Sequence, residues 1–432
     1  MRWSVGVCAV TVGLVVGAGC AARGRSPREP EGNPAAAGTG AEFEATFVRA
    51  GRALSAGDLA LAKSLTAELR AHDPGRGDGR VLAALVARRE AHPGEDWVDA
   101  FALAWRDVWL TEDPTGPRPQ LTAFVVHPPF PEDIPPIPPA AREAVAGEPA
   151  ELLLAIEDER SGHRFERLIQ LSLRYSTPDA PLSIRLLAFA LLSPINRCHH
   201  TGLPRELCGR ARARTLALAE DLSRERPDAI LFPLWAALDG SDVGRPLSAR
   251  TLAQLQNAAR RAQLTVPRFE AYAAYKQMYA VLGIAKPELR AATIVNLSSE
   301  FFSMVWPVHA LEDALKAAGA DQRAALAEIL ESVGRAYVRR GTFLDWQHGA
   351  RLLHLAARQK ADPVLEQRAA LLRSYSALLL WDVGGASSLE VWPVEPLSTE
   401  AIELRMQDEI ALNHRLLGLP MPHDLASLLL SE

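Results

Sequence analysis

The chain has 432 residues, of which 48% are hydrophobic and 23% are charged, and its formal net charge is -5. This balance is typical of a protein that buries a core in water, and the length suffices for two or three average domains or one elongated array. Because nucleic-acid binding needs a basic surface, the acidic balance gives no reason to expect a nucleic-acid partner.

The N-terminal stretch carries the pattern of an export signal. After Arg2 no charge occurs until Arg23, and an apolar run from Val5 to Val16 leads into the small residues before Cys20. A positive start, an apolar stretch and a small-residue cleavage region mark such signals. An uncleaved anchor helix over residues 3–22 is an alternative, since about 20 uncharged residues can cross a bilayer, and an ordinary cleaved signal is another.

A cysteine placed directly after small residues resembles the lipobox of bacterial lipoproteins. The resemblance implies that residues 1–19 are removed and that Cys20 becomes the lipidated first residue. Ala21, in place of aspartate, implies the outer membrane, with the body facing the periplasm or the cell surface. Residues 20–40 are rich in Pro, Gly and Arg and lack aromatic and branched aliphatic residues, so we expect a flexible tether.

Two cysteines remain after Cys8 leaves with the signal and Cys20 takes lipid. They are Cys198 and Cys208, and in an oxidising compartment they favour a disulfide. His199 and His200 follow the first of them, so a zinc site and two free thiols stay as alternatives.

Helical periodicity begins near Glu42 and predicts a first helical region over residues 41–112. Apolar residues recur at three- and four-residue spacing on both sides of the turn Gly57-Asp58, which predicts a helical hairpin that ends at Asp73-Pro74. Gly57-Asp58, Ala62 and Asp73-Pro74 resemble a tetratricopeptide repeat. A second partial match runs through Leu330, Val333, Gly334, Tyr337, Gly341, Ala350, Ala357 and Asp362-Pro363, with about four extra residues in a turn from Thr342 to Gly349.

Ten prolines between Pro114 and Pro139 exclude regular helix, so residues 113–140 are predicted to be an extended connector or, alternatively, a docking strip for a partner. Short amphipathic helices punctuated by proline fill residues 141–432. No β pattern competes with them. We therefore predict an all-α fold, an α-solenoid of tetratricopeptide-like hairpins.

Candidate catalytic and metal-binding groups are sparse. Asp345, His348 and His354 lie in or beside the predicted second turn, where an acid beside an imidazole suits a general base, but a solvated polar turn is the plainer interpretation. The acidic run Glu157-Asp158-Glu159 with His163 and Glu166 suggests a carboxylate metal helix or simply a charged turn. No phosphate loop, nucleophile elbow or zinc-protease motif occurs. We predict no catalytic residues, no metal and no cofactor.

These observations predict a lipid-anchored scaffold that binds another envelope protein or a peptide. The expected binding face carries Tyr272, Tyr275, Tyr279, Phe301 and Trp306, although such a stripe also suits a core. The alternative is an envelope hydrolase or metal-dependent enzyme whose site gathers histidines from several helices. A pocket that brings His199, His200 or His348 to a carboxylate would favour the enzyme.

Overall fold

The computed structural model describes residues 34–112, 139–152, 154, 165–192, 204–227, 229–239, 245–260, 276, 305–339, 342–382, 389 and 392–418. The regular elements of these ranges are α-helices, so the all-α prediction is confirmed. The predicted signal, Cys20 and almost all of the proline-rich connector lie outside the described residues.

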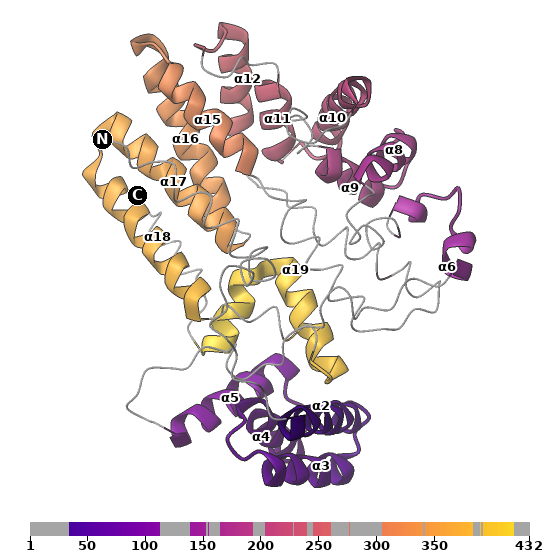
Figure 1. The fold of residues 1–432 in the computed structure, drawn as a ribbon. Coiled ribbons are helices and arrows are strands. Elements are labelled where there is room, and N and C mark those ends of the chain that lie inside the picture. The colour runs from indigo at the N-terminus through magenta and orange to yellow at the C-terminus, as the bar shows by residue number, and fades with distance from the viewer. Residues whose placement is uncertain are drawn as a thin grey trace.

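The N-terminal helices are α2 (Pro34–Ser55), α3 (Leu59–His72), α4 (Gly77–Ala91) and α5 (Trp97–Glu112), each packed against the next (Figure 1). The predicted hairpin is α2 and α3. Gly57 adopts a positive φ of 79°, and the Asp58 side chain accepts the Leu61 N–H at 3.0 Å as the N-cap of α3. Helix α2 begins earlier than expected, inside the predicted tether. Proline at its first position and a following run of alanines favour a helix there.

The middle helices are α6 (Pro139–Ala144), α8 (Phe165–Tyr175), α9 (Leu182–Leu192), α10 (Arg205–Glu225), α11 (Leu231–Asp239) and α12 (Ala249–Ala259). From α8 onward each helix in this series contacts its successor, and α12 contacts α16. Short-range packing between consecutive helices therefore builds this part of the molecule.

The C-terminal helices are α15 (Val305–Ala317), α16 (Ala320–Arg339), α17 (Phe343–Lys360), α18 (Pro363–Asp382) and α19 (Glu395–Leu417). Helices α16 and α17 cross at two glycines. A Cβ added to Gly349 would lie 2.8 Å from the carbonyl oxygen of Gly334 and 2.6 Å from Cγ2 of Val338. Only glycine allows the two backbones to come this close.

The enlarged turn predicted from Thr342 to Gly349 is wrong, because α17 already begins at Phe343. Thr342 and Asp345 form a capping box: the Asp345 N–H donates to the Thr342 hydroxyl at 3.2 Å, and the Thr342 N–H donates to the Asp345 carboxylate at 2.9 Å. The predicted loop residues are thus the first two turns of a helix.

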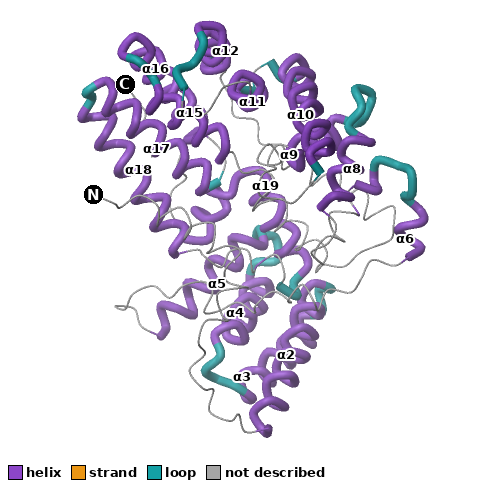
Figure 2. The backbone as a smooth tube through the Cα atoms, turned by 45° about the horizontal axis from the view of Figure 1, so that its top comes forward, coloured by secondary structure: helices purple, strands orange, loops and turns teal. Residues whose placement is uncertain are grey.

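Two hydrophobic cores hold the helices together. The first, here called the array core, draws on α8 to α12 and on α15 to α17. The second, the closing core, joins the N-terminal helices to the C-terminal part of the chain, through Phe43, Phe47, Phe101, Trp105, Trp346, Leu372, Trp392, Ile410 and Leu416 among others. Figures 1 and 2 show α2 to α5 gathered at one end of the molecule, with α19 between them and the remaining helices.

The segment before α19 seals the closing core. Trp392, three residues before the start of α19, is fully buried, and its indole makes edge-to-face contacts with Phe47 and Phe101 at centroid distances of 5.6 and 4.9 Å. Pro393 packs so tightly on α2 that a Cβ at Gly51 would lie 2.6 Å from its Cγ. Helix α19 then packs along α5. No helix among the described residues combines the length and the apolar character needed to span a membrane.

Candidate functional site

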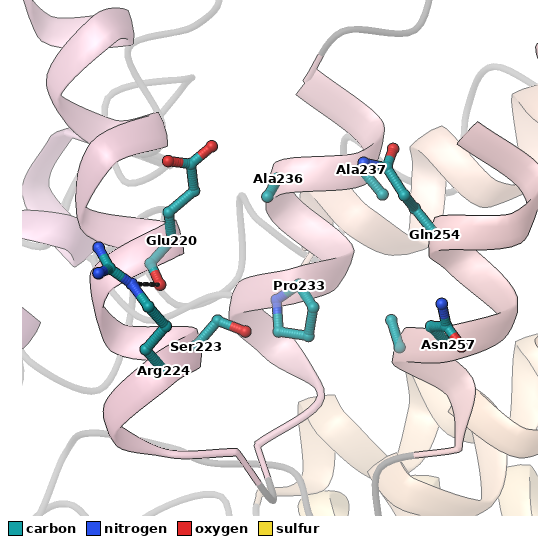
Figure 3. A pocket seen from close by; sticks show the side chains of 9 residues that line it. Glu220, Ser223, Arg224, Pro233, Ala236, Ala237, Gln254 and Asn257 are labelled. Atoms are coloured by element: carbon teal, nitrogen blue, oxygen red, sulfur yellow. Dashed lines mark hydrogen bonds between the residues drawn. The ribbon is translucent and has the colours of Figure 1, made fainter. Parts of the chain in front are cut away.

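A groove with a volume of about 420 Å³ runs across three successive helices, α10, α11 and α12 (Figure 3). Its floor consists of small side chains and its two sides carry polar ones. The lining residues are Glu220, Ser223 and Arg224 from α10, Pro233, Ala236 and Ala237 from α11, and Gln254, Asn257 and Ala258 from α12. The groove is open, so a ligand reaches it without any movement of the backbone.

The sequence of α11 explains why a hollow forms there. Its large side chains, Phe232, Leu234 and Trp235, are buried in the array core, where Phe189 makes edge-to-face contacts with both rings at 5.3 and 5.8 Å. The opposite face carries only proline and alanine, which are too small to fill the space between α10 and α12. Burial of one face of α11 therefore leaves a depression over the other.

The sides of the groove carry hydrogen-bonding groups of both kinds. Arg224 pairs with Asp221, one turn back on α10, so its charge is already balanced. The Asn257 side-chain oxygen accepts Arg260 Nη2 at 2.6 Å, which leaves the amide nitrogen of Asn257 as the donor that faces other partners. Together with Gln254 and Ser223, it can bond to the peptide groups of an extended chain. The lining residues include no histidine or cysteine, and their one carboxylate is Glu220, one turn before Ser223 on α10.

Most of the predicted binding face cannot be compared with this groove. Tyr272, Tyr275, Tyr279 and Phe301 lie outside the described residues, and Trp306 belongs to the first turn of α15. The aromatic binding face therefore stays a prediction. Sequence reasoning overlooked the α10–α12 groove, whose only local signal is the placement of Pro233, Ala236 and Ala237 among large apolar residues.

A second polar cluster joins α15 to α17 and bears on the enzyme alternative. Glu312 is buried, and its Oε2 accepts Arg351 Nη2 at 2.6 Å while His309 Nδ1 lies 3.5 Å from it. His348 lies close enough for the charges of His309 and Arg351 to act on it. The cluster thus combines two imidazoles from different helices with one buried carboxylate.

The chemistry of His348 does not suit a general base that works near neutral pH. Burial, assisted by His309 and Arg351, lowers its pKa to about 4, and its Nε2 is buried without a hydrogen-bond partner. Asp345, the predicted orienting acid, caps α17 instead. The carboxylate in the cluster, Glu312, is held by Arg351. His354, the third residue of the predicted group, lies on the surface with its Nδ1 3.5 Å from Glu366.

The predicted disulfide and its metal alternative involve only one described residue. Cys208 lies in the first turn of α10, half-buried against the array core. Cys198, His199 and His200 lie outside the described residues, so the pairing stays a prediction. In the described part of the chain, no three His, Cys, Asp or Glu side chains are grouped in a way that could hold a metal ion.

No protein-family model, curated protein or solved structure matches this chain.

Proposed function

We propose that this protein is a lipid-anchored, helical-repeat scaffold of the cell envelope that binds an extended segment of another protein in the α10–α12 groove. The lipobox-like sequence at Cys20 supports the anchor and, with Ala21, an outer-membrane location. The observation that carries the binding role is the groove itself, an open hollow of about 420 Å³ with a floor of small residues and polar sides.

An α-solenoid architecture fits the packing of the middle helices. Each helix from α8 to α12 contacts its successor, as in arrays whose units bury their faces only against neighbours. The α2–α3 hairpin and the glycine crossing of α16 and α17 fall at the two partial tetratricopeptide-like matches. Such arrays work through extended surfaces that take peptides or protein segments.

Polar side chains and a low floor suit a polypeptide main chain better than a compact apolar ligand. An extended segment offers alternating N–H and C=O groups; the amide of Gln254 can pair with both, and the amide nitrogen of Asn257 can donate to a C=O group. Small residues on the floor let the main chain approach closely. Side chains of the bound segment would then point along the groove and outward.

A photocrosslinking experiment in intact cells tests this role. A photoreactive side chain at Gln254 should capture a partner protein, and the substitution Ala236→Arg on the floor should abolish that capture because the long side chain fills the hollow. Ala213→Arg adds the same side chain at an exposed position of α10, outside the groove, and should leave capture unchanged. Capture that persists in Ala236→Arg, or no crosslink at Gln254, contradicts the proposal.

The anchor is tested separately by the intact mass of protein extracted from membranes. Acylation at Cys20 and a loss of two hydrogens from Cys198 and Cys208 are the expected changes. An unmodified chain that begins at Met1 contradicts the anchor without affecting the groove.

A further inference from the structure

Arg214 is a half-buried cation at the junction of α8, α9 and α10, which lie together in Figure 1. Its Nε donates to the hydroxyl of Ser176 at 2.9 Å, and Ser176 is fully buried at the end of α8. This bond fixes the plane of the guanidinium. Its two terminal nitrogens, which carry four of the five N–H groups, point away from the serine.

No carboxylate among the described residues lies within ion-pair distance of Arg214. Burial lowers the pKa of Arg214, Asp221 two turns along α10 raises it, and Arg185 on α9 lowers it. Asp221 is engaged by Arg224. Arg185 donates through both terminal nitrogens to the two oxygens of Glu225, so that carboxylate is also taken.

Two neighbouring groups share this lack of partners. Arg210 lies one turn before Arg214 on α10, is exposed, and forms no ion pair with a described residue. On α8, one turn before Ser176, the hydroxyl of Ser172 is completely buried and has no hydrogen-bond partner.

A partly desolvated cation without a counter-charge is costly unless a ligand supplies that charge. A guanidinium whose Nε is already held presents its outer edge as a fork, which matches two oxygens of a carboxylate or a phosphate group. We propose that Arg214, with Ser176 as the positioning residue, forms a binding site for an oxyanion, the phosphate or carboxylate group of a ligand. The site lies apart from the α10–α12 groove and does not depend on the function proposed for it.

Isothermal titration calorimetry of the full chain in detergent tests the site with three probes at equal ionic strength: inorganic phosphate, acetate and chloride. We expect saturable binding of phosphate or acetate and none of chloride, and the comparison of the first two identifies the preferred oxyanion. Binding should weaken at least tenfold in Arg214→Gln. Arg214→Lys keeps the charge but loses the fork of N–H donors, so its affinity should lie between those of the wild type and Arg214→Gln.

Arg205→Gln is the matched control, since it removes the same charge from the start of the same helix at an exposed position on another face. Its affinity should stay within twofold of the wild type. Circular dichroism confirms that each variant is folded. The proposal is overturned if neither oxyanion binds the wild type, or if Arg205→Gln loses as much affinity as Arg214→Gln.

Discussion

The carboxylate of Glu400 on α19 accepts the backbone N–H of Trp97 at 2.9 Å, across 303 positions of the sequence. It also accepts the N–H of Val98 at 3.3 Å, and so it caps the start of α5 from a distant helix. The Arg415 guanidinium lies 3.6 Å from the Glu400 carboxylate. It also forms ion pairs with Asp96, just before α5, and with Asp99 in the first turn of α5. Side chains of α19 therefore cap the N-terminus of α5.

Removal of this long-range cap should weaken the closing core. Glu400→Ala leaves two N–H groups of α5 without their acceptor, and we expect a loss of about 1–2 kcal/mol in the free energy of unfolding, as for other N-caps. Glu400→Gln keeps one side-chain oxygen and should lose less. Urea unfolding measures both. Glu403→Ala is the control on the same helix as Glu400. It removes only an exposed ion pair with Lys276, so it should change the free energy of unfolding by less than about 0.5 kcal/mol.

The glycine crossing of α16 and α17 predicts opposite effects for two identical substitutions. Gly349→Ala places a methyl group against Val338 and the Gly334 carbonyl, so we expect a loss of about 1–3 kcal/mol, the usual cost of overpacking. Gly209→Ala, in open space on α10, should stabilise by up to about 1 kcal/mol because alanine favours helix. Equal effects in thermal unfolding would show that α16 and α17 do not approach this closely.

His348 should make the protein sensitive to acid. The imidazole is neutral in the folded protein, with a pKa of about 4, and takes up a proton near pH 6.5 once unfolded. Because the unfolded state binds this proton first, the stability contributed above pH 6.5 is lost as the pH falls toward 4. The total is about 3 kcal/mol.

His348→Leu removes the titrating imidazole, so the free energy of unfolding should fall less steeply between pH 6.5 and pH 4. His354→Gln, at a histidine on the surface of the same helix, should retain the wild-type slope. Urea unfolding at successive pH values gives the comparison. A wild-type slope in His348→Leu would assign the acid sensitivity to other groups.

Trp392 should be among the most costly residues to truncate. Its indole fills the space between Phe47 and Phe101, so Trp392→Ala opens a cavity and should cost about 3–5 kcal/mol. Leu61→Ala, at a half-exposed position of α3, should cost far less. Protection of α2 and α5 amides in hydrogen exchange should fall in Trp392→Ala, because both helices pack on this ring.

The parts of the fold that follow from local signals could be predicted from the sequence. Gly57 and Asp58 determine the α2–α3 turn by backbone conformation and capping, and both act within a few residues of the chain. The start of α17 was missed because its capping box, Thr342 with Asp345, contains aspartate where glutamate or glutamine is the familiar partner. The burial of Trp392 could not be predicted, because it depends on contacts with helices more than 290 positions away, beyond the reach of periodicity.

The candidate site was less accessible to sequence reasoning. An aromatic stripe is a recognisable sequence pattern. The groove instead depends on the small size of three side chains of α11, Pro233, Ala236 and Ala237. Its depth arises only when α10 and α12 stand on either side. Arg214 is equally inconspicuous in the sequence, since the absence of a nearby carboxylate is a property of three packed helices.

The closing core has a consequence for how the chain is made. Helices α2 to α5 are synthesised first, but Trp392, Glu400 and Arg415 arrive only near the end of synthesis. Until then Phe47 and Phe101 remain uncovered, and contacts that span so much sequence form slowly. During that interval the early helices expose apolar surface, so the growing chain is most open to aggregation before α19 is made.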